Sequence, residues 1–209
     1  SFSRHIHTGR DNQTAHFWRD MISDIGLRED ELSGKTLGII GLGSIGSRVA
    51  KLAKAFDMHV IATKRDLSNG TDIADEVFSP DSLSTLLERS DFVVLNCPLT
   101  TDTQNIINKE SLNLMKSSSY LINVARGGCV EENDLIHALN NGDIAGAALD
   151  HFWDDPLPNN SPFWDMGNVI ITPHTAGETR LYEENVIDIL LENLDRLCEG
   201  QETLVNQIV

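Results

Sequence analysis

The chain has 209 residues, 40% of them hydrophobic, and a formal net charge of −16 at pH 7. This excess of acidic residues argues against binding to nucleic acid or to an anionic membrane surface, because both repel a negatively charged protein. No apolar stretch approaches the ~20 residues that a transmembrane helix needs, and residues 1–5 lack a signal-peptide pattern, so we predict a cytoplasmic protein.

The first part of the chain is polar and then changes to a strand–helix pattern. Residues 1–25 are helix-compatible but have no preceding strand to pack on, so we expect a further part on the N-terminal side. Residues 36–40 form a short apolar run, which predicts a strand buried on both faces. A helix is predicted from Ser44 to Phe56, because apolar residues recur there at helical spacing, namely Ile45, Val49, Leu52, Ala53 and Phe56.

The alternation continues to the end of the chain. Asn108 is predicted to cap one helix, and Gly142 to end another. Short strands that alternate with helices are typical of βαβ units, so the sequence predicts an α/β Rossmann-like fold with a doubly wound parallel sheet. The remaining predicted strands are 59–63, 91–95, 120–123, 144–150 and 168–172, and the remaining predicted helices are 80–89, 108–115, 130–140 and 178–199.

A glycine-rich turn joins the first predicted strand to the helix that follows it. Gly41, Gly43 and Gly46 have the G-x-G-x-x-G spacing in that strand–helix context. The first glycine permits a tight turn, the second lets backbone approach a pyrophosphate, and the third allows close helix–sheet packing. Backbone N–H groups around Ser44 and Ile45 are expected to hold the phosphate oxygens. The turn therefore predicts a dinucleotide site, with a turn that serves packing alone as the alternative.

The end of the second predicted strand bears on the choice of cofactor. A carboxylate about 20 residues beyond the turn binds the ribose 2′-hydroxyl of NAD, whereas an arginine nearby accommodates the 2′-phosphate of NADP. Lys64 and Arg65 stand at that point, and Asp66 follows them. Cations attract a 2′-phosphate and a carboxylate repels it, so the pattern favours NADP(H). NAD(H) remains open, because Asp66 could reach the ribose while both cations are solvated.

Four further motifs follow predicted strands in order. Ligands bind beyond the carboxyl ends of the strands in an open α/β sheet. With the glycine turn, these motifs give the chain a resemblance, from about residue 30 to its end, to the D-2-hydroxyacid dehydrogenase family. The motifs are Cys97–Thr100, Asn123–Gly128, Gly146–Asp150 and Thr172–Gly177.

The resemblance implies a domain organisation. Members of this family have a substrate domain, built mainly from the N-terminal portion of the chain, and a cofactor domain. Residues 1–28 would then be a connecting helix or arm, 29–178 the NAD(P)-binding domain, and 179–209 a helix and tail that return toward the substrate domain. The resemblance also implies a homodimer.

Reduction of a 2-oxo acid needs two kinds of side chain, and the sequence offers a candidate for each. The substrate carboxylate needs a cation, and Arg126 offers a bidentate guanidinium just past a strand end, followed by two glycines. The developing alkoxide needs a proton donor, and His174 is an acid–base group suited to neutral pH. The alternatives are a structural salt-bridge arginine and a structural histidine.

The resemblance adds roles for further residues. It maps the family's arginine, acidic partner and histidine onto Arg126, Asp155 and His174. It implies that Asp150 bonds to the nicotinamide carboxamide, and that a set of other residues lines the cofactor. This set is Cys97, Pro98, Val124, Ala125, His174 and Gly177.

The chain departs from the family pattern at two positions. Asp155 stands where the family usually has glutamate, so its contact with His174 is expected to be longer or bridged by water. His151 follows Asp150 directly and has no assigned role.

Two other functions remain open at this point. The same scaffold supports oxidation of formate or phosphite, and members of the superfamily act as cofactor-sensing corepressors that recruit partners. We expect no metal site, since His5, His7 and His16 suit no helical metal face and three dispersed cysteines form no C-x-x-C pair. The expected ligands are a small 2-oxo or 2-hydroxy acid and NAD(P)(H).

Overall fold

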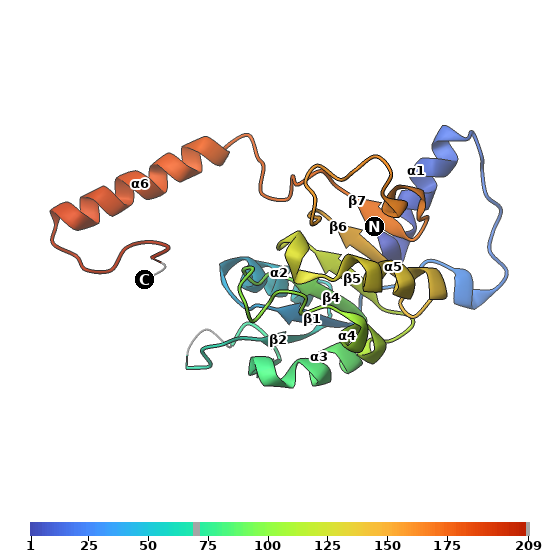
Figure 1. The fold of residues 1–209 in the computed structure, drawn as a ribbon, viewed down its shortest axis with the longest axis horizontal. Helices are drawn as coiled ribbons and strands as arrows, with labels where there is room; N and C mark the ends of the chain where they lie inside the picture. The colour runs from blue at the N-terminus through green and yellow to red at the C-terminus, as the bar shows by residue number, and fades with distance from the viewer. Residues whose placement is uncertain (69–71, 208–209) are drawn as a thin grey trace. The chain divides into compact units, whose positions relative to one another are not determined.

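The computed structural model describes residues 1–68 and 72–207 (Figure 1). The chain divides into two compact units, Ser1–Pro173 and His174–Val209. Each unit is described here by itself.

The described residues of the first unit form a seven-stranded sheet in which every pair of neighbours is parallel. The strand order β3-β2-β1-β4-β5-β6-β7 confirms the predicted doubly wound α/β fold. The strands are β1 Thr36–Ile40, β2 His59–Thr63, β3 Glu76–Phe78, β4 Phe92–Leu95, β5 Tyr120–Asn123, β6 Gly146–Leu149 and β7 Val169–Ile171.

Helices alternate with these strands along the chain, as the sequence predicts. The α-helices of the first unit are α1 Ile6–Thr14, α2 Ser44–Ala55, α3 Leu83–Arg89, α4 Lys109–Leu114 and α5 Glu132–Asn141. Short 3-10 helices lie at Phe2–Arg4, Ile25–Leu27, Pro80–Ser82, Gly127–Cys129 and Pro162–Asp165.

The core consists of two layers, one on each face of the sheet. Ile39 and Val60 belong to one hydrophobic cluster, whereas their chain neighbours Ile40 and Ile61 belong to the other. Successive side chains of a strand point to opposite faces, so both faces of these strands are buried. This double burial explains why the strands read as continuous apolar runs rather than as alternating patterns.

The predicted apolar face of α2 is partly wrong. Ile45, Leu52 and Phe56 are 65%, 64% and 58% exposed. The buried residues of the helix are Gly46, Ala50 and Ala53, of which the sequence analysis predicted only Ala53. A Cβ on Gly46 would lie only 2.4 Å from the carbonyl oxygen of Gly41. The helix therefore lies so close to the glycine turn that small residues face the sheet there, and hydrophobicity alone does not identify its packed face.

The predicted helix ends agree with the structure to within a few residues. The Asn108 side chain accepts a hydrogen bond from the backbone N–H of Ser111, which confirms it as the N-cap of α4. Gly142 ends α5 with φ 73°, a left-handed conformation that favours glycine. The sequence analysis did not predict β3, whose three residues are too few for a recognisable period.

The second unit contains one long helix, α6, which spans Tyr182–Cys198. The helix begins four residues later than the predicted Glu178 and has no buried residue. Within the described parts of the chain, no helix is both long and apolar enough to span a bilayer.

Candidate active site

A cavity of about 760 Å³ lies at the carboxyl ends of β1, β2 and β4. β1 and β4 are neighbours although the chain forms β2 and β3 between them, so the cavity lies where the strand order reverses. This position is where open α/β sheets bind ligands. The cavity is lined by Ile40–Gly43, Thr63–Asp66, Pro80, Asp81, Leu83, Asn96–Pro98, Thr100, Asp102, Thr103 and Ile106.

Each of the three glycines of the turn is required, or tolerated, for a different structural reason. Gly41 has φ 99°, and a Cβ there would lie 2.9 Å from the backbone nitrogen of Cys97. Gly46 allows the close approach of α2 to the turn. Gly43, the N-cap of α2, lines the cavity, and a Cβ there would meet nothing within 4 Å. The open space at Gly43 suits a ligand that approaches the backbone at the helix N-terminus, as a pyrophosphate does.

The structure brings some of the predicted cofactor residues to this cavity and leaves others outside its lining. Gly41, Gly43, Lys64, Arg65, Cys97 and Pro98 line it. Ser44, Ile45 and Gly46 form the first turn of α2 directly after the lining residues. Val124, Ala125 and Asp150 follow the neighbouring strands β5 and β6 and are not part of the lining.

The glycine turn and the end of β2 are joined by hydrogen bonds. The backbone N–H of Leu42 donates to the carbonyl oxygen of Thr63 at 3.0 Å. Lys64 is half-buried and Arg65 is exposed at the same strand end. The Oδ1 atom of Asp66 accepts from the backbone nitrogen of Ser68 at 2.9 Å and from its hydroxyl at 2.6 Å. One oxygen of the Asp66 carboxylate is therefore engaged by its own loop.

The loop after β4 is held by a threonine that the sequence analysis did not single out. The Thr103 hydroxyl donates to the carbonyl oxygen of Pro98 at 2.6 Å, and it accepts from the backbone N–H of Thr100 at 2.8 Å. These bonds fix the segment that forms one wall of the cavity. A threonine five residues after a proline has no distinctive sequence signal, so only the structure identifies it.

Cys97 lies beside a second buried cysteine, Cys129. A hydrogen bond between the two thiols, together with burial, raises the pKa of Cys97. The same hydrogen bond lowers the pKa of Cys129. Cys129 follows β5 and Cys97 follows β4, so the parallel register of these strands brings together two residues that are distant in sequence.

The backbone around Arg126 is shaped by Asn123, the last residue of β5. Asn123 is buried, and its Oδ1 accepts from the N–H of Ala125 while its Nδ2 donates to the carbonyl oxygen of Arg126, both at 3.0 Å. The Arg126 guanidinium donates to the carbonyl oxygen of Ala125 at 2.6 Å, and the residue as a whole is exposed. The predicted carboxylate anchor thus stands on a loop with a fixed shape and is accessible.

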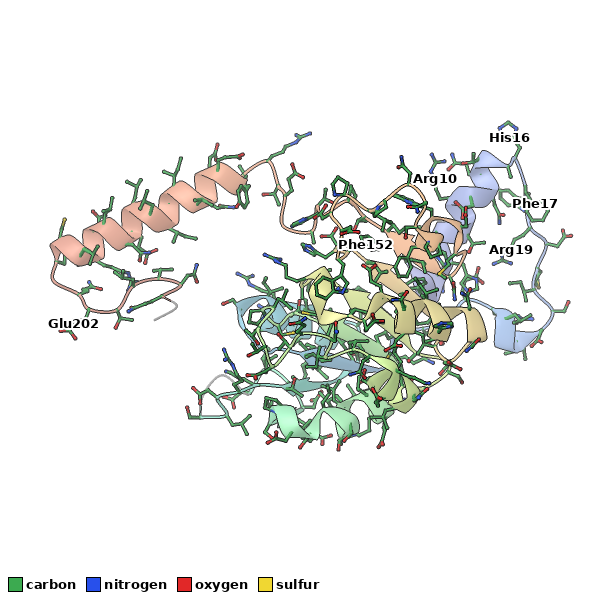
Figure 2. The ribbon with its side chains drawn as sticks, in the orientation of Figure 1. Arg10, His16, Phe17, Arg19, Phe152 and Glu202 are labelled. Atoms are coloured by element: carbon green, nitrogen blue, oxygen red, sulfur yellow. The ribbon has the colours of Figure 1, made fainter. Side chains whose placement is uncertain are left out.

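The segment after β6 packs closely against that loop. A Cβ on Gly127 would lie 2.0 Å from the carbonyl carbon of Phe152, so a side chain cannot be accommodated there. The Phe152 ring, labelled in Figure 2, lies with its centroid 5.6 Å from that of Phe163. The indole N–H of Trp153 donates to the carbonyl oxygen of Val130 at 3.1 Å. These contacts fix the chain that carries Asp150 and Asp155.

Asp150 is a buried carboxylate at the sheet edge, beside Thr172 and His151. Its Oδ1 accepts from the Thr172 hydroxyl at 2.5 Å, and its Oδ2 lies 3.8 Å from Nε2 of His151. Asp150 and His151 are only 4% and 7% exposed. The structure therefore places His151, for which the sequence offered no role, beside the predicted nicotinamide aspartate.

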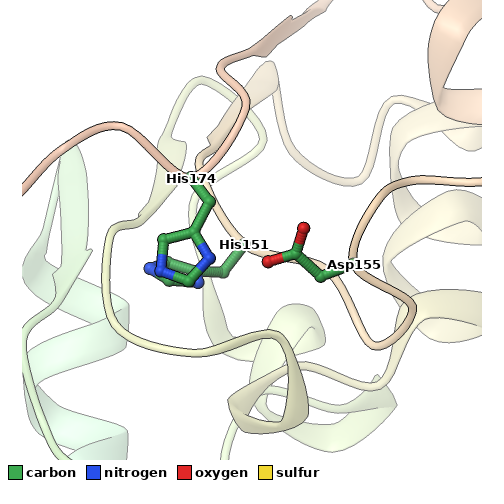
Figure 3. Close-up of side chains that lie close together, drawn as sticks. All are labelled: His151, Asp155 and His174. Carbon is green, nitrogen blue, oxygen red and sulfur yellow. The ribbon is translucent and has the colours of Figure 1, made fainter. Parts of the chain in front are cut away.

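Asp155 is exposed, and one of its carboxylate oxygens lies within 4.8 Å of a ring nitrogen of His151. Figure 3 draws both side chains together with that of His174. His174 is the first residue of the second unit and directly follows Pro173, so covalent geometry holds its Cα about 3.8 Å from that of Pro173.

Known proteins resemble this chain closely. The model for "D-isomer specific 2-hydroxyacid dehydrogenase, NAD binding domain" matches residues 1–176. A glyoxylate reductase from Thermofilum pendens is 40% identical over 187 residues, which cover 88% of this chain and 55% of that protein. A hydroxypyruvate reductase from Blautia hydrogenotrophica is 35% identical over 205 residues, which cover 93% and 61%. The chain therefore spans little more than half the length of these relatives.

A solved structure supports the same relationship. A D-isomer specific 2-hydroxyacid dehydrogenase from Xanthobacter autotrophicus Py2, in complex with NADPH and MES, has a TM-score of 0.83 and 31% sequence identity. The match covers 99% of this chain and 81% of the solved chain. The similarity thus extends through the sheet, the glycine turn and α6.

Proposed function

Because the chain belongs to the D-isomer specific 2-hydroxyacid dehydrogenase family, we propose that it is the nucleotide-binding part of an enzyme that interconverts a 2-oxo acid and a D-2-hydroxy acid. The observation that carries the proposal is the cavity at the reversal of strand order. Its wall combines the open Gly43 with Lys64 and Arg65. An open helix N-terminus suits a pyrophosphate, and the two cations suit a further phosphate group.

We propose that NADP(H) is preferred over NAD(H). Lys64 and Arg65 lie at the end of β2, where the 2′-substituent of the adenosine ribose is expected. Asp66, the rival group, has one carboxylate oxygen engaged by Ser68. The related dehydrogenase from Xanthobacter autotrophicus was solved with NADPH, which supports this choice.

The proposed chemistry assigns one task to each of four side chains. A bound reduced nicotinamide supplies the hydride. Arg126 holds the substrate carboxylate through two parallel N–H bonds, and His174 donates a proton to the carbonyl oxygen as the alcohol forms. A carboxylate near an imidazole favours the protonated form of the ring. Asp155 is proposed to act in this way on His174. Asp150 orients the nicotinamide carboxamide and so selects the ring face that meets the substrate.

The proposed substrates are small 2-oxo acids. Two relatives are named glyoxylate reductase and hydroxypyruvate reductase, and both names refer to short 2-oxo acids. Since the chain covers 55% and 61% of their lengths, we propose that the remaining part of the enzyme supplies the other wall of the substrate pocket. The homodimer implied by the resemblance stays a prediction.

Turnover by the full-length enzyme tests this function. The wild-type enzyme, supplied with NADPH, should reduce at least one of glyoxylate, hydroxypyruvate and pyruvate, and His174→Ala should lower kcat by roughly 10²- to 10⁴-fold. His137→Ala is the matched control, because His137 is exposed on α5. Normal turnover by His174→Ala would remove the histidine from the mechanism. Turnover of formate or phosphite alone would replace the proposed reaction.

A further inference from the structure

Asn96 lines the cavity at the end of β4. It follows β4 directly, and its backbone N–H donates to the carbonyl oxygen of Ile40 at 2.9 Å. A Cβ on Gly41 would lie 3.0 Å from the carbonyl carbon and oxygen of Asn96. The residue therefore lies against the first glycine of the turn and belongs to the cavity lining. No pattern in the sequence singles it out.

The side-chain amide of Asn96 is buried without a hydrogen-bond partner. Among the described residues, neither its Nδ2 nor its Oδ1 is bonded, although both atoms are shielded from solvent. Buried polar side-chain atoms in native proteins are hydrogen-bonded in the large majority of cases. An amide that lacks partners for both its donor and its acceptor, in the wall of a ligand cavity, indicates that a ligand supplies them.

The neighbouring strand shows what a purely structural asparagine looks like at this edge. Asn123 ends β5, beside the end of β4, and its acceptor and donor are both used by its own loop, through Ala125 and Arg126. Asn96 has the same side chain one strand away but makes no such bonds. The difference separates an asparagine that shapes a loop from one whose hydrogen-bonding groups have no partner among the described residues.

We propose that the Asn96 amide hydrogen-bonds the hydroxyl groups of the second ribose of the dinucleotide, the ribose that carries the nicotinamide. This inference rests on the proposed function. If the 2′-phosphate end lies at Lys64 and Arg65 and the pyrophosphate at the glycine turn, the second ribose comes next, at the end of β4. A ribose diol both donates and accepts, so it satisfies Nδ2 and Oδ1 together. A pyrophosphate oxygen only accepts and would leave Oδ1 unpaired.

Binding measurements on the whole chain test this assignment without catalysis. The variant is Asn96→Leu, which keeps the approximate size of the side chain and removes both polar groups. Calorimetric titration with NADPH, ADP-ribose and ADP separates the parts of the ligand, because ADP lacks the second ribose. We expect Asn96→Leu to weaken NADPH and ADP-ribose by about tenfold and to change ADP by less than twofold.

Thermal melting of the ligand-free protein supplies the second readout. Asn96→Leu should leave the Tm unchanged or raise it, because the amide has no protein partner to lose. The same change at the matched position, Asn123→Leu, should lower the Tm, because two hydrogen bonds are lost. Equal weakening of all three ligands, no weakening, or a lowered Tm for Asn96→Leu would overturn the inference. Failure of the wild-type chain to bind NADPH or NADH would instead overturn the proposed function.

Discussion

Thr172 donates its hydroxyl hydrogen to the buried carboxylate of Asp150, with 2.5 Å between Oγ1 and Oδ1. The bond joins the residue after β7 to the residue after β6, and it fixes one oxygen of Asp150 at the edge of the sheet. Asp150, the proposed orienting group for the cofactor, is therefore held by a residue from the neighbouring strand end, and neither residue belongs to the cavity lining.

Thr172→Val should destabilise the protein by about 2 kcal/mol, because a hydrogen bond to a buried charged group is lost while the side-chain shape is kept. Urea unfolding followed by circular dichroism measures the change. Thr101→Val, at an exposed threonine, is the control and should alter the free energy of unfolding by no more than about 0.5 kcal/mol. Equal stability of wild type and Thr172→Val would contradict the importance of this bond.

Alanine substitutions at two glycines of the turn should have opposite effects on the Tm and on cofactor binding. Gly43→Ala adds a methyl group to open space, so the Tm should hold while cofactor affinity falls by about tenfold or more. Gly46→Ala places a methyl group 2.4 Å from a backbone oxygen, so the Tm should fall. Thermal melting combined with titration of NADPH measures both effects. If Gly43→Ala bound NADPH as tightly as wild type, the pyrophosphate would have to lie elsewhere.

Lys64→Asp should reverse or abolish the preference for NADPH. Replacing a cation by an anion beside the 2′-phosphate converts attraction into repulsion, so the ratio of NADPH to NADH affinity should fall by about tenfold or more. Fluorescence titration with both cofactors gives this ratio. Lys109→Asp makes the same charge change on α4, away from the cavity lining, and should leave it unaltered. If Lys64→Asp left the ratio of NADPH to NADH affinity unchanged, the end of β2 would not recognise the 2′-phosphate.

Asp155→Asn in the full-length enzyme should lower the rate of 2-oxo acid reduction most strongly at the alkaline end of the pH range. The neutral amide no longer favours the protonated form of a nearby imidazole, so the proton donor is lost at a lower pH than in the wild type. The pH dependence of kcat measures this shift, and Asp154→Asn is the adjacent control. Superimposable profiles for wild type and Asp155→Asn would exclude Asp155 from the mechanism.

Glu76, in the edge strand β3, forms an ion pair that should make the stability of the protein depend on pH. Its carboxylate accepts from Arg89 and lies 3.2 Å from Nε2 of His59. The Arg89 guanidinium, followed by His59, lowers the pKa of Glu76 from its ordinary 4.5 to about 2. A lowered pKa in the folded state gives stability that is full above pH 4.5 and is lost as the pH falls toward about 2.

Glu76→Gln should therefore remove part of the fall in Tm below pH 4.5 and lower the Tm at neutral pH. Differential scanning calorimetry between pH 7 and pH 3 gives the two curves. Glu88→Gln, at an exposed glutamate of α3, is the control and should keep the wild-type pH dependence. Parallel curves for wild type and Glu76→Gln would show that the ion pair with Arg89 does not contribute.

The sequence alone determined the elements whose cause is local. Apolar runs marked strands that are buried on both faces, Asn108 and Gly142 marked helix ends, and the glycine spacing marked the turn beside the cavity. These features depend on backbone conformation and on hydrophobic periodicity, and both are determined by a short stretch of sequence. The same reasoning was wrong about Ile45 and Leu52, because the distance of α2 from the sheet is a tertiary property.

Only the tertiary structure decided how residues on different strands meet. Parallel pairing brings Thr172 to Asp150, Cys97 to Cys129, and Asn96 to Gly41, and each pair joins chain segments that lie tens of residues apart. Whether a polar group is satisfied depends on such neighbours, so Asn96 and Asn123 look alike in sequence and differ in the fold. Composition and spacing set the type of site, and strand register set which side chains it contains.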